Sequence, residues 1–373
     1  MKVNYDYYTG KDEYTDGDIE LEIINYLKEY GEDGYQTVLT NDYRWPVFYH
    51  ITPIRKNIIN WYSFKKGAEI LEIGAGMGAI TGALCRENVN VTAVELSKQR
   101  ATAIMERCKD KENLEIIVGN FNDIKFEKKY DYITLIGVLE YASLYTNTDN
   151  PFHDFLVQIK DLLKEDGKLL IAIENQFGLK YFTGAKEDHT AIKYDGIEGY
   201  SNKSGIRTFG KGELTNILNK AGFTNTKYYY PLPDYKLPNV IFSDDYLPDE
   251  KSIEEYTPYV SDETNKVSFD EKKAYLDIIK NGEFGFLANS FFIEASQKEL
   301  NTNIDLKKQS LIKIDESMKA FYDKHFEIDR KDYQDVLKEN EKLKTEINNM
   351  ANSTSWKITK PIRDLRTNLK KKV

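Results

Sequence analysis

The sequence predicts an α/β fold in which helices cover a mostly parallel sheet. Short apolar runs, each typical of a buried strand, alternate with segments of helical periodicity through much of the chain. Alternation of this kind is typical of parallel strands joined by right-handed helical crossovers. A glycine-rich turn at residues 74–78 follows the first of these apolar runs and precedes a helical segment.

The glycine-rich turn organises the prediction for the rest of the chain. The run EILEIGAGMG at residues 69–78 places three glycines at alternate positions directly after Ile70, Leu71 and Ile73. Glycine lets a ligand approach the backbone closely, and the N-terminus of the following helix presents N–H groups there. The turn therefore predicts a nucleotide-like ligand, and a glycine turn without any ligand is the simpler alternative.

The glycines alone do not choose between ligands. Gly74, Gly76 and Ala79 also fit the looser dinucleotide pattern G-x-G-x-x-A, with Glu95 near the place of a ribose-binding acid. An NAD-dependent oxidoreductase acting on a nucleotide sugar or alcohol is therefore an alternative. Short-chain reductases carry a Tyr-x-x-x-Lys pair after the loop. Here Tyr62 and Lys66 precede it, which disfavours that alternative.

Polar side chains follow the ends of the neighbouring predicted strands. Glu95 ends the strand at residues 91–95, Asn120 and Phe121 end the third strand, and Glu140 follows the fourth strand at residues 130–136. Ligands of open α/β sheets bind at the carboxyl ends of the strands. We therefore expect these residues to lie around one cleft.

This ordered set, with Glu72 completing E-x-G-x-G-x-G, resembles the class I S-adenosylmethionine-dependent methyltransferases over residues 56–297. The resemblance implies a Rossmann-like seven-stranded methyltransferase sheet, mostly parallel with an antiparallel last strand. It implies S-adenosyl-L-methionine as cofactor, with the loop beside its methionine part, Glu95 on the ribose hydroxyls and Asn120 in place of the usual acid near adenine. The expected cofactor-binding residues are Glu72, Gly74, Ala75, Gly76, Gly78, Glu95, Leu96, Asn120, Phe121 and Gly137.

Transfer of a methyl group to a hydroxyl benefits from a general base. Glu140 and Glu174 are expected at strand ends that face the cleft. His189, beside Asp188, lies in an irregular insertion at residues 175–210, which we interpret as a lid over the acceptor. A solvated loop histidine is the alternative for His189, and the choice of base among the three residues stays open.

Composition narrows the function classes. Of the 373 residues, 61 are acidic and 52 basic, which disfavours a general nucleic-acid binder. The two cysteines match no metal-ligand spacing, so no metal is expected, and they fit a reducing cytoplasm. No apolar run reaches the roughly 18 residues that span a bilayer. A cytoplasmic location is therefore predicted.

The chain divides into four predicted regions. These are an N-terminal helical segment (1–55), the methyltransferase domain (56–297, with insertions at 175–210 and 243–286), a helical extension (298–350) and a basic amphipathic tail (351–373). Residues 1–17 are predicted to be loosely structured, Asp18 to cap a helix at 19–30, and a second helix to span 53–62. The aromatic segment at 43–50 is interpreted mainly as packing of this second helix onto the sheet. The alternative is a flap over the cofactor, with Tyr49, His50 or Arg55 near its carboxylate, and Arg55 is kept as a candidate for that role.

The later strands are predicted from apolar runs. A turn at Asp166 and Gly167 leads into a fifth strand at 168–174, a sixth spans 223–230, and the last, at 288–294, is expected to be antiparallel. The segments NQFGLKYF (175–182) and YPLPDYKLP (230–238) resemble methyltransferases encoded with, or fused to, glycosyltransferases of bacterial surface polysaccharides. That resemblance implies O-methylation of a sugar or glycan acceptor and a glycosyltransferase partner. A non-catalytic scaffold in a glycan-assembly complex is the alternative.

The C-terminal extension shows two short heptad rows, Tyr333, Asn340 and Ile347 beside Val336, Leu343 and Met350. They predict a short coiled coil and a homo-oligomer, or else a single helix packed on the domain. The tail interleaves Trp356, Ile358, Ile362 and Leu365 with basic residues and resembles tails of cell-surface glycosyltransferases. It predicts a peripheral contact with the inner face of the cell membrane, and a disordered basic terminus is the alternative.

Overall fold

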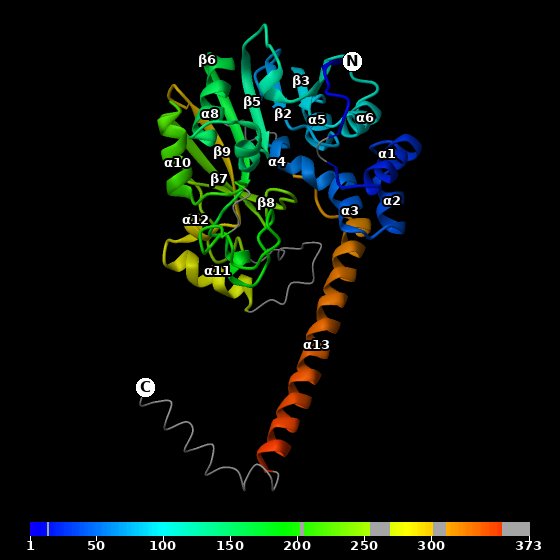
Figure 1. Cartoon of the computed structure of the whole chain (residues 1–373), viewed down its shortest axis with the longest axis vertical. Helices are drawn as coiled ribbons and strands as arrows, with labels where there is room; N and C mark the ends of the chain where they lie inside the picture. Colours follow the sequence, from blue (N-terminus) through cyan, green and yellow to red (C-terminus); the bar gives the residue numbers. More distant parts are fainter. Residues whose placement is uncertain (13–14, 202–204, 254–268, 301–310, 353–373) are drawn as a thin grey trace. The chain divides into compact units, whose positions relative to one another are not determined.

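The structure is a computed structural model that describes residues 1–12, 15–201, 205–253, 269–300 and 311–352. It contains a nine-stranded sheet in the order β1-β4-β3-β2-β5-β6-β9-β7-β8 (Figure 1). The strands are β1 (Lys2–Tyr7), β2 (Glu69–Ile73), β3 (Asn90–Glu95), β4 (Leu114–Gly119), β5 (Tyr130–Ile136), β6 (Leu163–Glu174), β7 (Asn225–Leu232), β8 (Val240–Ser243) and β9 (Ser290–Ser296).

The pairing of the strands confirms the predicted mixed sheet. Every pair from β1 to β6 is parallel, whereas β9 runs antiparallel to both β6 and β7. The predicted number of strands was wrong, because β1 adds to one edge and β8 to the other. Residues 1–17 were expected to be loose. Instead β1 pairs parallel with β4, and Val3 and Tyr7 pack against opposite core clusters.

The helices lie between and beside these strands. They are α1 (Ile19–Tyr30), α2 (Tyr35–Asn41), α3 (Trp45–Ile51), η1 (Pro53–Lys56), α4 (Asn57–Asn60), α5 (Ala79–Leu84), α6 (Lys98–Arg107), η2 (Phe121–Asp123), η3 (Leu139–Tyr141), α7 (Ala142–Tyr145), α8 (Pro151–Leu162), α9 (Leu179–Phe182), α10 (Lys211–Lys220), α11 (Glu271–Lys280), α12 (Phe284–Leu287) and α13 (Glu316–Asn352). In the described part of the chain, no helix has both the length and the apolar composition needed to cross a bilayer.

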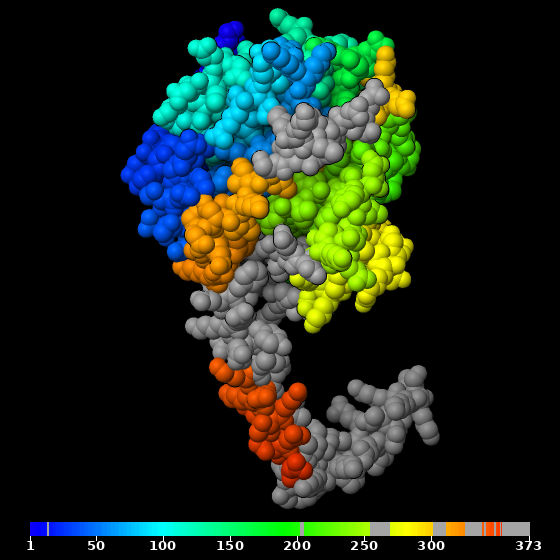
Figure 2. All heavy atoms as spheres, turned by 180° about the vertical axis from the view of Figure 1, so that it is seen from behind, coloured from blue at the N-terminus to red at the C-terminus, as the bar shows by residue number. Residues whose placement is uncertain are grey.

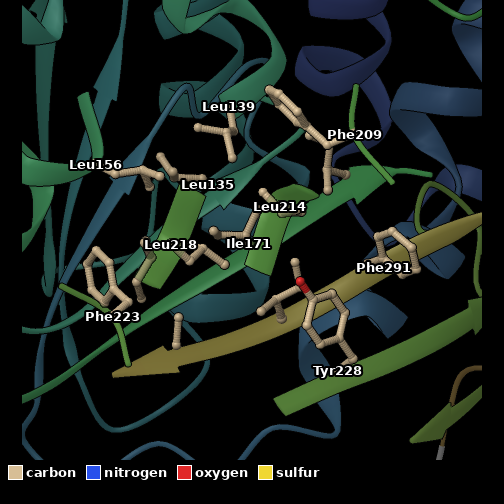
Figure 3. Close-up of a cluster of buried hydrophobic side chains, with 14 of the residues drawn as sticks. Leu135, Leu139, Leu156, Ile171, Phe209, Leu214, Leu218, Phe223, Tyr228 and Phe291 are labelled. Atoms are coloured by element: carbon tan, nitrogen blue, oxygen red, sulfur yellow. The ribbon is translucent and has the colours of Figure 1, made fainter. Parts of the chain in front are cut away.

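Two apolar clusters hold the sheet between its helices. Alternate residues of a strand point to opposite faces, so Leu71 joins one cluster and Ile70 the other. On the first face the strands pack against α8 and α10, whose Leu156, Leu214 and Leu218 meet the sheet (Figure 3). On the second face they pack against α4, α5 and α6. The resulting rigid layer fixes where the strand ends lie.

Three local predictions were wrong in detail. Asp18 forms no side-chain cap at α1; its backbone is already helical. The helix expected at 53–62 is divided into η1 and α4. Asp166 and Gly167 lie within β6 rather than in a turn before it, because the register with β5 shifts between Tyr130 and Tyr132 and absorbs the extra residues.

Residues 1–322 form one compact unit and residues 323–373 a second. Within the first unit, the start of α13 packs on the N-terminal helices, and Figure 2 shows this orange segment against the blue part of the surface. The rings of Phe48 and Phe321 stack at a centroid distance of 3.7 Å, and Asp315 accepts a hydrogen bond from Tyr35 at 2.7 Å. In the second unit Leu343 and Met350 are exposed. The coiled coil stays a prediction, and the predicted membrane-binding tail from residue 353 lies outside the described residues.

Candidate active site

A cavity of about 600 Å³ lies at the carboxyl ends of the central strands. Its wall includes Glu72, Gly74, Ala75, Gly76, Glu95, Leu96, Asn120, Phe121 and Gly137, so the tertiary structure brings nine of the ten residues predicted for the cofactor to one place. The tenth, Gly78, does not line the cavity. It precedes α5 with a φ of 84°, and a Cβ there would lie 3.1 Å from the backbone of Ile104.

The glycines of the loop serve different purposes. Gly74 has a φ of 72°, and a Cβ on it would lie 2.6 Å from Cγ2 of Val138. Gly76 has a φ of 55°, but no atom lies within 4 Å of where its Cβ would be. Gly74 is therefore required by the packing of the protein itself, whereas Gly76 keeps a space beside the cavity open.

Glu95 ties the loop to the neighbouring strand. Its Oε2 accepts a 2.7 Å hydrogen bond from the N–H of Gly76, and its Oε1 accepts a 2.9 Å bond from the N–H of Ser97. Burial raises the pKa of this carboxyl. The position at the end of β3, on the cavity wall, agrees with the predicted contact to a ribose, which stays a prediction.

Two buried charged groups lie at the loop end of the cavity without a complete set of partners. Arg55 has its guanidinium carbon 3.8 Å from the ring centroid of Tyr49, and its Nε and Nη1 form no hydrogen bond. Oε2 of Glu72 also lacks a partner, and burial raises the pKa of Glu72 to about 8. Burial lowers the pKa of the adjacent His50, so that its imidazole is neutral. Leaving buried polar groups unpaired is costly, so both groups are candidates for contact with a ligand.

Of the three candidate bases, Glu140 and His189 line the same cavity, whereas Glu174, expected to face the cleft, is fully buried beside His189 and does not line it. Glu140 lies in η3 after β5, Glu174 ends β6, and His189 comes from the 175–210 insertion. Nε2 of His189 is 3.4 Å from Oε2 of Glu174, and Nδ1 lies 3.0 Å from the hydroxyl of Tyr141. The side chain of His189 is only 6% exposed, so the alternative of a solvated loop histidine is wrong.

An ion network surrounds this cluster. Lys236 pairs with both Glu174 and Asp188, while Lys180 lies 2.9 Å from Asp188 and 2.7 Å from Asp234. The sequence did not predict Lys236 on the cavity wall, nor Lys180 and Asp234 in the network behind it. All three lie within the segments quoted for the narrower resemblance, but nothing in the sequence brings these segments together.

The network sets the protonation of the three candidates. Burial raises the pKa of Glu174, but Lys236 and His189 outweigh it and bring the pKa to about 2. Burial lowers the pKa of His189, but Glu174 and Glu140 raise it to about 9. Burial raises the pKa of Glu140 to about 8, and neither carboxyl oxygen of Glu140 has a hydrogen-bond partner among the described residues. Of the three candidates, Glu140 is therefore the residue whose two carboxyl oxygens are both available to a ligand.

The insertion that carries His189 is folded over the cavity rather than extended into solvent. Lys186, Glu187, Asp188, His189 and Ala191 line the cavity. Glu187 accepts 2.7 Å hydrogen bonds from the N–H groups of His189 and Thr190, which fixes the turn. Ala191 adopts a φ of 56°, in the left-handed region that non-glycine residues rarely occupy. Part of the insertion therefore forms the cavity wall, and its role as a lid stays a prediction.

Comparisons with known proteins agree with this geometry. A family model described as "Methyltransferase domain" matches residues 48–228. Ribosomal RNA small subunit methyltransferase A of Mycoplasma mycoides is 25% identical over 270 residues, which cover 71% of this chain and 90% of that relative. An uncharacterized methyltransferase of Alkaliphilus oremlandii is 32% identical over 36% of this chain and 60% of its own length.

One further curated relative and one solved structure are also similar to the chain. The ubiquinone biosynthesis O-methyltransferase of Rickettsia bellii is 24% identical over 37% of this chain and 57% of its own length. In the solved complex of a putative methyltransferase with its Trm112 activator from Haloferax volcanii, the match is 14% identical, covers 67% of this chain and 91% of that one, and has a TM-score of 0.40. The family match over residues 48–228 and the curated relatives support an S-adenosylmethionine-dependent methyltransferase domain in this chain.

Proposed function

We propose that the protein transfers the methyl group of S-adenosylmethionine to a hydroxyl oxygen of a sugar or glycan acceptor in cell-surface polysaccharide biosynthesis. The observation that carries this proposal is the carboxyl of Glu140. It is buried, both its oxygens lack partners, and it faces the same cavity as the glycine loop. A carboxylate so placed can accept the proton of a hydroxyl while the oxygen attacks the methyl carbon.

The two ends of the cavity suit the two substrates. Arg55 at the loop end offers two unpaired guanidinium N–H positions for the carboxylate of the cofactor, and Glu72 lies where its positive groups are expected. The loop would then lie beside the methionine part of the cofactor, with Glu95 at the ribose and Phe121 at the adenine. The methyl group moves in a single displacement at the sulfonium carbon, and the protein contributes mainly by aligning donor and acceptor.

The chemistry of the acceptor end favours a polyol. Glu140, His189, Lys236, Tyr141 and Tyr235 line it, which gives hydrogen-bonding groups interleaved with aromatic rings. The ubiquinone and demethylmenaquinone methyltransferases act on quinones by their names, so a quinol is the alternative acceptor; Trp45, Val138 and Phe155 give the same cavity an apolar wall. A ribosomal RNA acceptor, as in the Mycoplasma relative, is disfavoured by the net charge of −9.

The partners follow from the acceptor. A glycosyltransferase that extends the same glycan is the proposed protein partner, and the C-terminal residues from 353 are the proposed contact with the inner face of the membrane. A homo-oligomer through α13 is proposed from the heptad rows. Flotation with anionic vesicles, comparing the full chain with one cut after Asn352, tests the membrane contact; equal behaviour of the two would contradict it.

An acceptor screen tests the proposal. Purified protein is first titrated with S-adenosylhomocysteine and with NAD⁺, and we expect binding of the former alone. It is then incubated with S-adenosylmethionine and panels of nucleotide sugars, lipid-linked glycans, quinols and RNA, with methylated products identified by mass spectrometry. We expect methyl ethers on the glycans. Methylation of quinols or RNA alone would contradict the proposal.

Variants then test the role of Glu140. Glu140→Gln should lower kcat by about 10²–10⁴-fold, the usual contribution of a general base, with little change in the affinity for S-adenosylhomocysteine. Glu198→Gln, at an exposed glutamate of the 175–210 insertion, is the control and should be fully active. Full activity of Glu140→Gln would remove Glu140 from the reaction.

A further inference from the structure

We propose that Glu140, Glu174 and His189 form a binding site for one divalent metal ion at the acceptor end of the cavity. Binding of the ion is independent of the proposed function, whereas its role in the reaction rests on that function. The spacing of these residues in the sequence shows no metal motif, because they come from three separate elements that only the fold brings together.

The geometry places three ligand atoms around one point. One oxygen from each carboxylate and one nitrogen of His189 lie within 4.8 Å of one another. A divalent ion binds nitrogen and oxygen ligands at about 2.0–2.2 Å, which holds them roughly 3–4 Å apart. Small rotations of these three side chains are therefore enough to bring the three ligand atoms within bonding distance of one ion.

A second observation points to a missing ligand. Glu140 is 1% exposed, and neither of its carboxyl oxygens has a hydrogen-bond partner. The nearest approach between His189 Nε2 and Glu174 Oε2 is 3.4 Å, longer than a normal hydrogen bond. Buried carboxylates are ordinarily paired or bound to a metal. A cation at this point would satisfy Glu140 and complete the partners of the other two residues.

The surroundings orient the ligands in the manner of metal sites. The hydroxyl of Tyr141 lies 3.0 Å from Nδ1 of His189, so that this bond can hold the proton on Nδ1 and leave Nε2 to bind the ion. Lys236 holds the other oxygen of Glu174, and Glu187 fixes the backbone of His189. Such outer contacts commonly set the tautomer and the direction of metal ligands.

Acidic side chains outnumber basic ones around this cluster. Glu140, Glu174, Asp188 and Asp234 lie with Lys180 and Lys236, and Glu187 adds a fifth carboxyl group. Such an excess of carboxyl groups suits a cation.

The donor set indicates the class of ion. One imidazole nitrogen with two carboxylate oxygens suits Mn²⁺ or Zn²⁺ better than Mg²⁺, which prefers oxygen ligands alone. With three protein ligands, coordination positions remain for the acceptor. A hydroxyl bound there becomes more acidic.

The reaction then balances without a further reactant. The acceptor oxygen forms a bond to the methyl carbon, the carbon–sulfur bond breaks, and its electron pair stays on the sulfur of S-adenosylhomocysteine. The proton of the hydroxyl passes to the oxygen of Glu140 that does not bind the ion.

Mn²⁺ is the probe for the test. The full chain is stripped with EDTA, desalted and titrated with Mn²⁺, and free Mn²⁺ is followed by electron paramagnetic resonance. We expect one bound ion per chain, with the affinity lowered at least tenfold in both Glu140→Gln and His189→Gln. His153→Gln, at a partly exposed histidine that does not line the cavity, is the matched control and should bind like the wild type. Unchanged affinity for S-adenosylhomocysteine shows that each variant is folded.

Absence of Mn²⁺ binding, or equal affinity in the wild type and both variants, would overturn the metal site. Methyl transfer to glycans with and without EDTA separates this result from the proposed function. Mn²⁺ bound at these residues without any glycan methylation would leave the metal site standing and contradict the proposed acceptor. Glycan methylation that persists in EDTA, with no Mn²⁺ bound, would support the proposed acceptor and overturn the metal site.

Discussion

The N–H of Gly76 donates a 2.7 Å hydrogen bond to Oε2 of Glu95 and so joins the glycine loop to the end of β3. The carboxylate therefore fixes the loop relative to β3. Because hydrogen bonds to charged groups are worth about 1.5–3 kcal/mol, Glu95→Ala should weaken S-adenosylhomocysteine binding roughly tenfold to a hundredfold by calorimetry. Glu69→Ala, at the opposite end of β2, should not. Equal affinity of the two variants would contradict this role.

Arg55 should recognise the amino-acid end of the cofactor. Its Nε and Nη1 are buried beside the cavity without partners. We expect Arg55→Gln to weaken S-adenosylhomocysteine binding about tenfold or more, since a charge-assisted bond to the carboxylate is lost. 5′-Methylthioadenosine, which lacks the amino-acid part, should bind both proteins alike. A parallel loss for both ligands would show instead that the variant disturbs the whole cavity.

Glu72 should make discrimination between the cofactor and its product depend on pH. Burial raises its pKa to about 8, so the carboxyl is mostly neutral at pH 7 and ionised at pH 9. Only S-adenosylmethionine carries a sulfonium charge. Its affinity relative to S-adenosylhomocysteine should therefore rise several-fold from pH 7 to pH 9. In Glu72→Gln the ratio should be flat over this range, and a flat ratio in the wild type would contradict the prediction.

Substitution of Gly74 should lower the stability of the fold, whereas substitution of Gly76 should abolish cofactor binding. A Cβ on Gly74 meets Val138, and its φ is positive, so Gly74→Val should destabilise the fold by at least about 1–2 kcal/mol in denaturant unfolding. Gly76 has open space around it. Gly76→Val meets only backbone strain there and should stay folded, but we expect it to lose S-adenosylhomocysteine binding. Retained binding by Gly76→Val would contradict the placement of the cofactor beside this glycine.

Phe321 should stabilise the N-terminal helices. It is fully buried and stacks on Phe48. Phe321→Ala should therefore lower the free energy of unfolding of residues 1–322 by about 3–5 kcal/mol, as is usual when a buried ring is removed. Leu343→Ala, at an exposed residue of the same helix, should change it by less than about 0.5 kcal/mol in dilute protein. Equal effects of the two substitutions would contradict the packing seen for α13.

The sequence by itself determined the central sheet and most of the cofactor end of the site. Apolar runs, glycines and strand-end acids are local signals, and the rule that parallel strands present their carboxyl ends at one edge joins Gly74, Glu95 and Phe121 without coordinates. Edge strands gave weaker signals. β1 buries little of either face, so its alternation is hidden by polar residues, and β8 has only four residues.

Only the tertiary structure decided what surrounds the acceptor. Glu140, Glu174, His189 and Lys236 come from segments far apart in the chain, and their protonation depends on burial and on each other's charge. Arg55 likewise became a firm candidate only when its guanidinium proved to be buried and unpaired. Local sequence encodes backbone preference and apolar periodicity, whereas the electrostatics of a buried site arise from distances that exist only after folding.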